Sequence, residues 1–231
     1  MNKHKLALRA AMQTGIMMQR TAKFDIFESM LLKYMHQDFT FLQIGANDGV
    51  RFDPLSKYIE IMGMKGVMVE PESKNYTELC EKYRDNEDIR IYKYAISKAA
   101  GKVKLYKAET TSENTPNWVN GMASLKRSHL DQLRGMDLEI VEEVVESVTI
   151  MQLLKMANIA NVDLLLVDAE GSDYEIISNI DYSCFKPKII YYEHNRHAGT
   201  MTAEEHNSLL ELLYKNSYKV YIDKNDCIAH L

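Results

Sequence analysis

The sequence predicts an α/β fold in which a mostly parallel sheet bears helices on both faces and ends in an antiparallel hairpin. Short apolar segments of strand length alternate along the chain with segments of helical periodicity. Segment 162–167 is apolar almost throughout, which is typical of a central strand in a parallel sheet because both of its faces are buried. Near the C-terminus, two strand-like segments flank a polar turn at 224–226, and this pattern predicts the hairpin.

Length and composition limit the possible classes of protein. The chain has 231 residues, which suits one α/β domain with some decoration, and we expect an N-terminal helical extension over 1–38 followed by a main domain over 39–231. The net charge of −5 is spread along the chain, so no nucleic-acid partner is predicted. Three widely spaced cysteines indicate a reducing compartment, and we expect a cytoplasmic protein. No apolar run approaches the roughly 20 residues of a transmembrane helix. The oligomeric state stays open.

The N-terminal segment has a weak pattern of its own. Residues 3–20 are basic and rich in methionine, but they lack the apolar core and cleavage site of a signal peptide. A packing helix or a loose tail is favoured over an amphipathic helix on a partner or membrane surface. Asp25 and Glu28 then form the pattern of a capping box, which predicts the start of a helix. Its apolar face consists of Phe27, Met30, Leu31 and Tyr34.

The first strand, 39–44, ends in a turn of small residues, 45–49, that contains an acid. Gly45 and Gly49 tolerate positive φ and leave the backbone accessible to a ligand. The second strand, 67–69, ends at Glu70, about 20 residues after the turn. This pairing is how a doubly wound sheet holds a nucleotide-type cofactor: the turn receives the charged middle of the ligand, and the second acid binds the ribose hydroxyls.

The rest of the chain continues the alternation. The elements expected next are a helix begun by Asp53 and Pro54 and ended by Gly63, a helix capped by Ser73, a strand over 89–96, a short strand over 102–106, a polar loop over 107–122, an edge strand over 143–148, a helix capped by Thr149, the strand 162–167, a helix with Ile177 inward, a strand over 188–192, and a helix with a capping box of Thr202 and Glu205. Loops as long as 107–122 are often lids or binding loops. Within it, Trp118 either anchors the loop or stacks on an acceptor ring.

Ligands of such sheets bind at the carboxyl ends of the strands. The polar residues expected at that edge are Asp48, Glu70, Asp168, Glu170, Glu193 and His194. With these residues the chain resembles the FkbM family of S-adenosylmethionine-dependent methyltransferases. The matching motifs are 43–49, Val69-Glu70-Pro71, Ala95-Ile96, 167–171 with Asp173, and Glu193-His194. Two positions depart from the family's pattern: Asp173 stands where Glu is more frequent, and Leu165 stands where Lys is common.

The resemblance extends from about residue 39 to the C-terminus and implies a Rossmann-like class I methyltransferase sheet. It also implies a cofactor site for S-adenosylmethionine, built from Gln43, Gly45, Ala46, Asn47, Asp48, Gly49, Glu70, Pro71, Ala95, Ile96 and Asp168. In this site the turn holds the methionine part, with Asp48 pairing its ammonium group. Glu70 accepts hydrogen bonds from the ribose hydroxyls, since a carboxylate is a two-oxygen acceptor. Each of these residues also has a purely structural interpretation. The turn 45–49 can be a tight turn without a ligand, Glu70 an exposed acid before a proline turn, and Ala95 with Ile96 ordinary strand packing.

His194, Glu170 and Asp168 are the candidate catalytic residues, with His194 the first choice as general base. A structural histidine and a helix-capping Glu170 are the alternative interpretations. Asp168, Glu193 and Asn195 also suggest a Mg²⁺ site, since oxygen ligands at adjacent strand ends suit that ion. The remaining histidines considered, His129, His197 and His206, are expected on the surface.

The function expected is methyl transfer from S-adenosylmethionine to a hydroxyl of a sugar, a glycan or another small natural product, as in polysaccharide modification. Two other classes stay open. A nicotinamide-dependent oxidoreductase uses the same kind of sheet, but the spacing Gly45-x-x-x-Gly49 fits its fingerprint poorly. A cofactor-binding scaffold without turnover is the second alternative.

Overall fold

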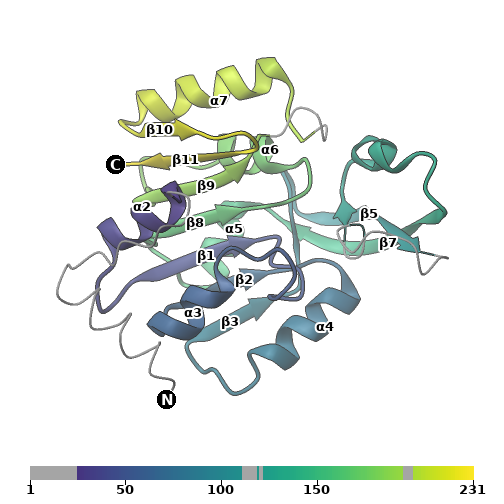
Figure 1. The fold of residues 1–231 in the computed structure, drawn as a ribbon, viewed down its shortest axis with the longest axis horizontal. Helices are drawn as coiled ribbons and strands as arrows, with labels where there is room; N and C mark the ends of the chain where they lie inside the picture. Colours follow the sequence, from purple (N-terminus) through teal and green to yellow (C-terminus); the bar gives the residue numbers. More distant parts are fainter. Residues whose placement is uncertain (1–24, 111–118, 120–121, 195–199) are drawn as a thin grey trace.

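The computed structural model describes residues 25–110, 119, 122–194 and 200–231, and its strands form two sheets (Figure 1). The large sheet has seven strands in the order β10-β11-β9-β8-β1-β2-β3. These strands are β1 (Thr40–Ile44), β2 (Lys65–Val69), β3 (Ile89–Tyr92), β8 (Leu164–Val167), β9 (Ile189–Glu193), β10 (Lys219–Ile222) and β11 (Asp226–His230). Neighbouring strands from β3 to β9 pair in parallel, and β11 pairs antiparallel with both β9 and β10. The predicted fold class, with its C-terminal antiparallel hairpin, is confirmed.

Helices cover both faces of the large sheet because successive side chains of its strands alternate between two cores. Leu42, Val67 and Leu165 belong to one apolar cluster, whereas their chain neighbours Phe41, Met68 and Leu164 belong to the other. The first cluster includes residues of α5 (Ile150–Met156), α6 (Asp173–Ser178) and α7 (Ala203–Lys215). The second includes residues of α2 (Ile26–Tyr34), α3 (Ser56–Met62) and α4 (Ser73–Lys82).

Helix α2 is the described part of the N-terminal extension, since residues 1–24 lie outside the described chain. It begins at Asp25, whose side chain accepts a hydrogen bond from the backbone N–H of Glu28, as predicted. Phe27 and Leu31 are buried in the same cluster as α3 and α4, and the Phe27 ring lies 4.8 Å from that of Tyr191. Segment 25–38 therefore packs on the core of the main domain.

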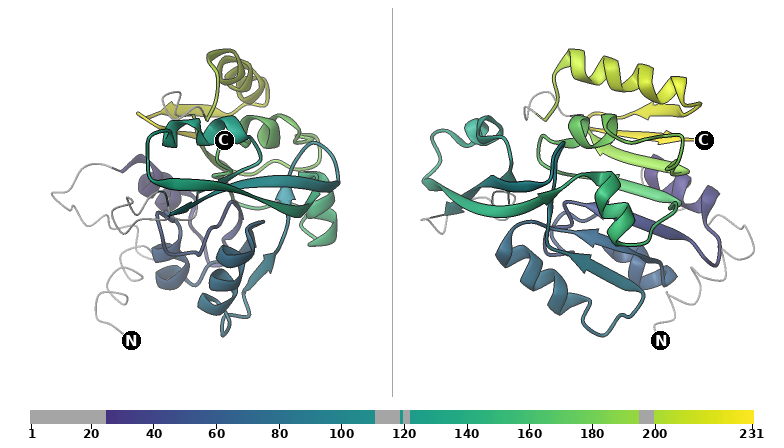
Figure 2. Two further views of the ribbon diagram at one scale, coloured as in Figure 1. Left: turned by 90° about the vertical axis from the view of Figure 1, so that its right-hand side faces the viewer. Right: turned by 180° about the vertical axis from the view of Figure 1, so that it is seen from behind.

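The second sheet was not predicted. It has the order β4-β7-β5-β6 and is built from β4 (Ala95–Ile96), β5 (Gly101–Thr110), β6 (Ala123–Ser124) and β7 (Leu138–Val148). The single strand expected over 89–96 is thus two strands in different sheets. The strand expected over 102–106 is longer than predicted, and the expected edge strand 143–148 is part of β7, which lies between β4 and β5. In the rear view of Figure 2 the β5–β7 pair extends sideways from the large sheet.

Charges explain why this sheet is hard to recognise. Lysines of β5 pair with glutamates of β7: Lys102 Nζ lies 3.9 Å from Glu146, which it faces directly, and Lys104 Nζ lies 2.8 Å from Glu142, which is diagonal to it. An alternation of lysine and glutamate resembles a solvated loop when the partner strand is unknown, although facing opposite charges stabilise a strand pair. A 3₁₀ segment, η2 (Arg127–Leu133), joins β6 to β7 and buries Leu130 and Leu133.

Helix starts were predicted with mixed success. The predicted cap at Thr149 and the predicted capping box of Thr202 and Glu205 are confirmed, and Thr149 forms a capping box as well. Helix α3 begins later than expected, at Ser56. The Asp53 carboxylate instead accepts hydrogen bonds from the backbone N–H of Leu55 and from Gln43 Nε2. The cap of α4 is Glu72, one residue before the expected Ser73.

Replacing Gly66 by Ala tests the packing of the face that β1 and β2 present to α3. A Cβ at Gly66 would lie 2.5 Å from ring atoms of the buried Phe41, so we expect the free energy of unfolding to fall by about 1–3 kcal/mol. Urea denaturation measures this change. In a Phe41→Leu background the added loss should be smaller, because the smaller side chain leaves room for the methyl group. An equal loss in both backgrounds would contradict the packing argument.

Candidate functional site

A cavity of about 630 Å³ lies at the carboxyl ends of β1, β2, β8 and β9, which is within the usual size of a small-molecule site. Strands β1 and β8 are neighbours at the floor of this cavity. From β1 the sheet continues to β2 and β3 on one side, and from β8 it continues to β9 on the other side. Doubly wound sheets bind ligands at such a switch point. Most of the predicted cofactor residues line this cavity: Gln43, Gly45, Ala46, Asn47, Glu70, Pro71, Ala95, Ile96 and Asp168.

Gly45 allows the turns after β1 and β8 to meet. Its φ is +79°, and a Cβ at this position would lie 1.8 Å from the backbone oxygen of Asp168. The backbone N–H groups of Gly45 and Ala46 both donate to the Val69 carbonyl at the end of β2. The turn is therefore held between the ends of two strands, and only glycine fits at its first position.

The Glu70 side chain joins the turn after β1 to the turn after β2. One carboxylate oxygen accepts a hydrogen bond from the backbone N–H of Asn47, and the other accepts one from Glu72, both at 2.9 Å. The side chain lines the cavity but is almost fully buried. Burial, aided by the nearby Glu72 and Glu143 carboxylates, raises the pKa of Glu70 to about 7 against the effect of its two hydrogen bonds. Each oxygen retains capacity for a second hydrogen bond.

Asp48 and Gly49 lie behind the turn rather than in the cavity wall. The Asp48 carboxylate accepts hydrogen bonds from the backbone N–H groups of Val50 and Arg51 and pairs with Arg51 Nε at 2.6 Å. Burial favours a raised pKa for Asp48, but these hydrogen bonds and the Arg51 charge hold it below its usual value. A Cβ at Gly49 would lie 2.7 Å from the Leu79 side chain of α4. Both residues shape the loop, and the Asp48 carboxylate is already occupied by contacts within it.

Carboxylates crowd the opposite side of the cavity, where Asp168, Glu170, Glu193 and Asp226 all line the wall. Burial and repulsion from Glu170 and the other nearby acids raise the pKa of Asp168 well above its usual range. Burial also raises the pKa of Glu193, although the Thr200 hydroxyl donates a hydrogen bond to its carboxylate at 2.9 Å. Asp226 was missed from the sequence. It begins β11, which pairs antiparallel with β9, so the hairpin returns to the edge where β9 ends.

Asp173 lies behind this wall and holds its backbone in place through hydrogen bonds. Its fully buried carboxylate accepts hydrogen bonds from the backbone N–H groups of Ala169 and Glu193, each at 3.1 Å. These bonds join the turn after β8 to the end of β9. Burial raises the pKa of Asp173 to about 7 against their effect.

His129 corrects the prediction that it lies on the surface. It is buried in η2, and its Nε2 lies 2.7 Å from a carboxylate oxygen of Glu170. The surface prediction failed because no local spacing links residue 129 to residue 170, and only the fold of the second sheet brings them together. His206 is likewise buried, where the surface was expected. His197 and Trp118 lie outside the described residues.

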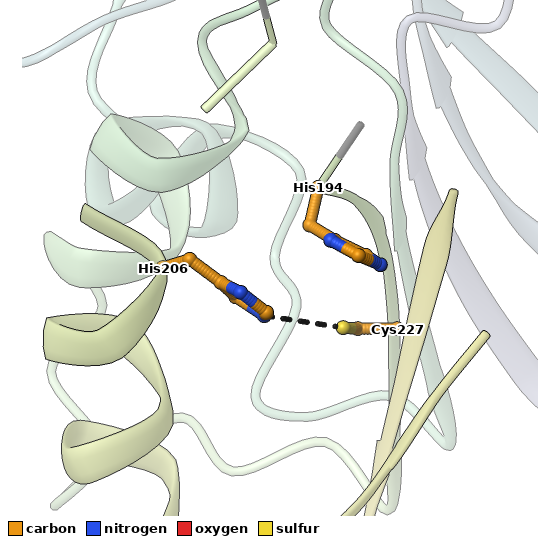
Figure 3. Close-up of side chains that lie close together, drawn as sticks. All are labelled: His194, His206 and Cys227. Atoms are coloured by element: carbon orange, nitrogen blue, oxygen red, sulfur yellow. Dashed lines mark hydrogen bonds between the residues drawn. The ribbon is translucent and has the colours of Figure 1, made fainter. Parts of the chain in front are cut away.

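His194, the first choice as general base, does not line the cavity. Its Nε2 is 2.9 Å from the Asp223 carbonyl, and its ring stacks on that of His206 with centroids 4.6 Å apart (Figure 3). The Cys227 sulfur lies 3.5 Å from His206 Nε2. The two rings are nearly parallel, at 13°. One ligand atom each from His194, His206 and Cys227 lie within 4.8 Å of one another, so the three side chains form a cluster between α7 and the hairpin that is separate from the cavity wall.

The proposed magnesium ligands are only partly brought together. Asp168 and Glu193 line one wall, and Asn195 lies outside the described residues. Within residues 25–110, 119, 122–194 and 200–231, the acids of this wall do not form a group of three ligand atoms close enough to hold one ion. The described helices also include none that is long and apolar enough to cross a bilayer.

The model of the FkbM methyltransferase domain matches residues 43–220, most of the chain. The chain belongs to the FkbM methyltransferase family. No curated protein sequence matches it. A solved FkbM methyltransferase from Methylobacillus flagellatus is similar in fold, with a TM-score of 0.51 and 14% identity over 84% of this chain and 44% of the other. The chain thus spans less than half the length of that protein.

Two further solved structures are similar at lower TM-scores. An O-methyltransferase from Bacillus cereus in complex with SAH has a TM-score of 0.45 and 11% identity over 99% of this chain and 90% of the other. An Aeropyrum pernix fibrillarin with bound S-adenosyl-L-methionine has a TM-score of 0.45 and 12% identity over 88% of this chain and 73% of the other. The match to the family model and the similarity to the Methylobacillus flagellatus structure confirm the predicted family and fold.

The buried acids of this FkbM domain make its stability depend on pH. Folding raises the pKa of Glu70 and Asp173 to about 7, so the folded protein binds more protons than the unfolded chain between about pH 4.5 and 7. The free energy of unfolding should therefore fall as pH rises through this window, by up to about 1.4 kcal/mol per pH unit for each of the two groups, and level off above it. Urea denaturation at pH 5 to 8.5 measures this.

Asp173→Asn should flatten this pH slope, because one titrating group is removed. Asp85→Asn should leave the slope unchanged, since that side chain is 96% exposed. A free energy of unfolding that rises with pH between 5 and 7 in the parent protein would show that the hydrogen bonds to the two carboxylates outweigh their burial.

Proposed function

We propose that this protein is an S-adenosylmethionine-dependent methyltransferase that methylates a hydroxyl of a sugar, a glycan or another small natural product. The observation that best supports the cofactor is Glu70. It lies at the end of β2, lines the cavity, and fixes the turn after β1 through the Asn47 N–H. An acid in this position suits ribose hydroxyls, as in other doubly wound sheets. A cytoplasmic location and a small-molecule or glycan acceptor, without nucleic acid, belong to the same proposal.

The cavity residues fit the three parts of this cofactor. Gly45, Ala46 and Asn47 would hold the methionine part, with the acid Asp168 close to its ammonium group. Ala95 and Ile96, both buried on β4, offer an apolar contact for the adenine ring. When bound, the cofactor supplies an activated methyl group from a positively charged sulfonium, and the surrounding carboxylates complement that charge.

The chain must also supply a group that receives the acceptor's proton. Glu170 suits this role because its side chain lines the cavity, is 30% exposed, and lies one residue beyond the Ala169 that follows Asp168. Asp168 shares the wall, and its raised pKa favours the protonated form. We therefore assign proton acceptance to Glu170 in place of His194, whose ring packs outside the cavity.

Charge also restricts the acceptor. The described wall is acidic: besides Asp168, which favours its protonated form, it contains the carboxyl groups of Asp53, Glu70, Glu170, Glu193 and Asp226. Its cation Arg51 already pairs with Asp48 and Glu78. An anionic acceptor would be repelled by this wall, so an uncharged hydroxyl compound is favoured. Phe52 stands at the same wall with its side chain largely exposed, as an apolar surface on which a sugar ring can rest.

The two alternatives make different demands on the site. A nicotinamide cofactor carries an anionic pyrophosphate, which the crowded carboxylates disfavour. A scaffold would bind the cofactor without turnover. Calorimetry with S-adenosylmethionine, its demethylated product and NAD⁺ separates the oxidoreductase from the other two classes. Incubation with methyl glycosides of glucose, galactose, mannose and rhamnose, followed by mass spectrometry of the demethylated cofactor, separates enzyme from scaffold. Repeating it with EDTA tests for Mg²⁺.

Glu70→Gln should weaken binding of S-adenosylmethionine by about 10- to 100-fold, the cost of disturbing hydrogen bonds to a buried charged group. Calorimetry at pH 8, above the raised pKa of Glu70, provides the measurement. Glu87→Gln removes an equal charge from an exposed position and should bind like the parent. Parental affinity in Glu70→Gln would remove Glu70 from the cofactor site.

Glu170→Gln should lower kcat by about 100-fold or more, because proton transfer by a positioned side chain typically contributes that much. His194→Asn should leave kcat within about threefold of the parent, since its ring faces α7. Both rates are measured at saturating cofactor with the best glycoside of the panel. A loss confined to His194→Asn would restore His194 as the general base.

A further inference from the structure

Three contacts join the second sheet to the turn after β8. His129 Nε2 lies 2.7 Å from a Glu170 carboxylate oxygen, and the Ser124 hydroxyl donates to the Glu170 backbone carbonyl at 2.6 Å. At Gly171, which has a φ of +95°, a Cβ would lie only 3.2 Å from His129 Nδ1. The turn after β8 therefore packs closely against the imidazole ring of His129. The backbone carbonyl of Glu170 is bound by Ser124 of β6, and its side-chain carboxylate is bound by His129 of η2.

Burial separates the roles of the two side chains. The His129 side chain is 1% exposed, whereas the Glu170 side chain is 30% exposed and lines the cavity. A carboxylate only accepts hydrogen bonds, so the imidazole must supply the hydrogen between them. We infer that His129 is a positioning residue, which holds one oxygen of Glu170 and leaves the other directed to the acceptor. This inference rests on the proposed function.

The backbone of Glu170 explains why such a support is needed. Its φ is +46°, which is a left-handed backbone conformation that residues other than glycine, asparagine and aspartate rarely adopt. A strained residue at a wall of a cavity keeps one conformation only when its neighbours fix it. Here Ser124 fixes the backbone and His129 fixes the carboxylate. Without these two hydrogen bonds the Glu170 side chain would populate several rotamers, and only a fraction of molecules would have its carboxylate in the orientation that the His129 contact fixes.

The segment that contains Ser124 and His129 also forms part of the cavity wall, on the side of Glu170 where we expect the acceptor to bind. Met122, Ala123, Leu125 and Gln132 all line it, and they come from β6, η2 and the residues beside them. The amide of Gln132 also donates to the His129 carbonyl at 3.1 Å. The residue that fixes the proton acceptor and the residues expected to touch the acceptor molecule therefore belong to one short segment, 122–132.

Two His129 variants test this inference. His129→Leu retains bulk but removes the hydrogen-bond donor, and His129→Gln places an amide donor near the position of Nε2. His36→Leu is the control, since His36 also pairs with a carboxylate, Asp163 at 3.0 Å, but its side chain is 42% exposed and outside the cavity wall. The first readout needs no acceptor: the ¹³C signal of the Glu170 carboxyl in the full chain with S-adenosylmethionine added, assigned by its loss in Glu170→Gln.

We expect the Glu170 signal to shift or broaden in His129→Leu, to return toward the parent in His129→Gln, and to stay unchanged in His36→Leu. On the best glycoside of the panel, His129→Leu should lower kcat at least about tenfold, and His129→Gln should recover most of it. Cofactor affinity should stay within about twofold in all three variants.

An unchanged Glu170 signal in both His129 variants would overturn the inference, as would parental kcat in His129→Leu. Failure of the proposed function looks different: S-adenosylmethionine does not bind, or no acceptor is methylated by the parent. In the latter case the carboxyl signal still decides whether His129 holds Glu170, because it requires no turnover.

Discussion

The site depends on the close approach of two backbone turns. The first residue after β1 faces the carbonyl of the first residue after β8 at a distance that excludes any side chain. Parallel pairing of β1 with β8 places these two strand ends at one edge, and Gly45 allows the turns beyond them to touch. The residues proposed to bind the cofactor and those proposed to contact the acceptor therefore line one cavity.

Glu70 and Asp173 play similar structural roles on the two halves of this edge. Each carboxylate is buried and accepts hydrogen bonds from two backbone N–H groups of different segments, although Glu70 follows β2 whereas Asp173 begins α6. A carboxylate in such a position costs free energy through desolvation but fixes the two turns relative to each other. The rigidity of the binding site and the raised pKa values of these acids thus have the same physical origin.

The sequence contained enough information to predict the large sheet and the strand-end residues that line one side of the cavity. Those features depend on local signals: an apolar strand, a turn with glycine, and an acid at the next strand end, as in 41–49 and 67–70. The β5–β7 pair was not predictable in the same way, because its alternating charges acquire meaning only when the partner strand is known. His129 and Asp226 were missed for the same reason, since pairing between distant segments brings them to the cavity. Conversely, Asp48 and His194 lie near the right strand ends, but their side chains have partners elsewhere.

The second sheet lies between β3 and β8 in the chain, yet it adds no strand to the large sheet. Its length, its charges and its tip at η2 can therefore vary without shifting the register of any strand that supports the turns at Gly45 and Asp168. Changes to this insertion can thus alter one wall of the cavity while the large sheet keeps its strand pairing. Under the proposed roles, any such change must retain the contact between η2 and Glu170.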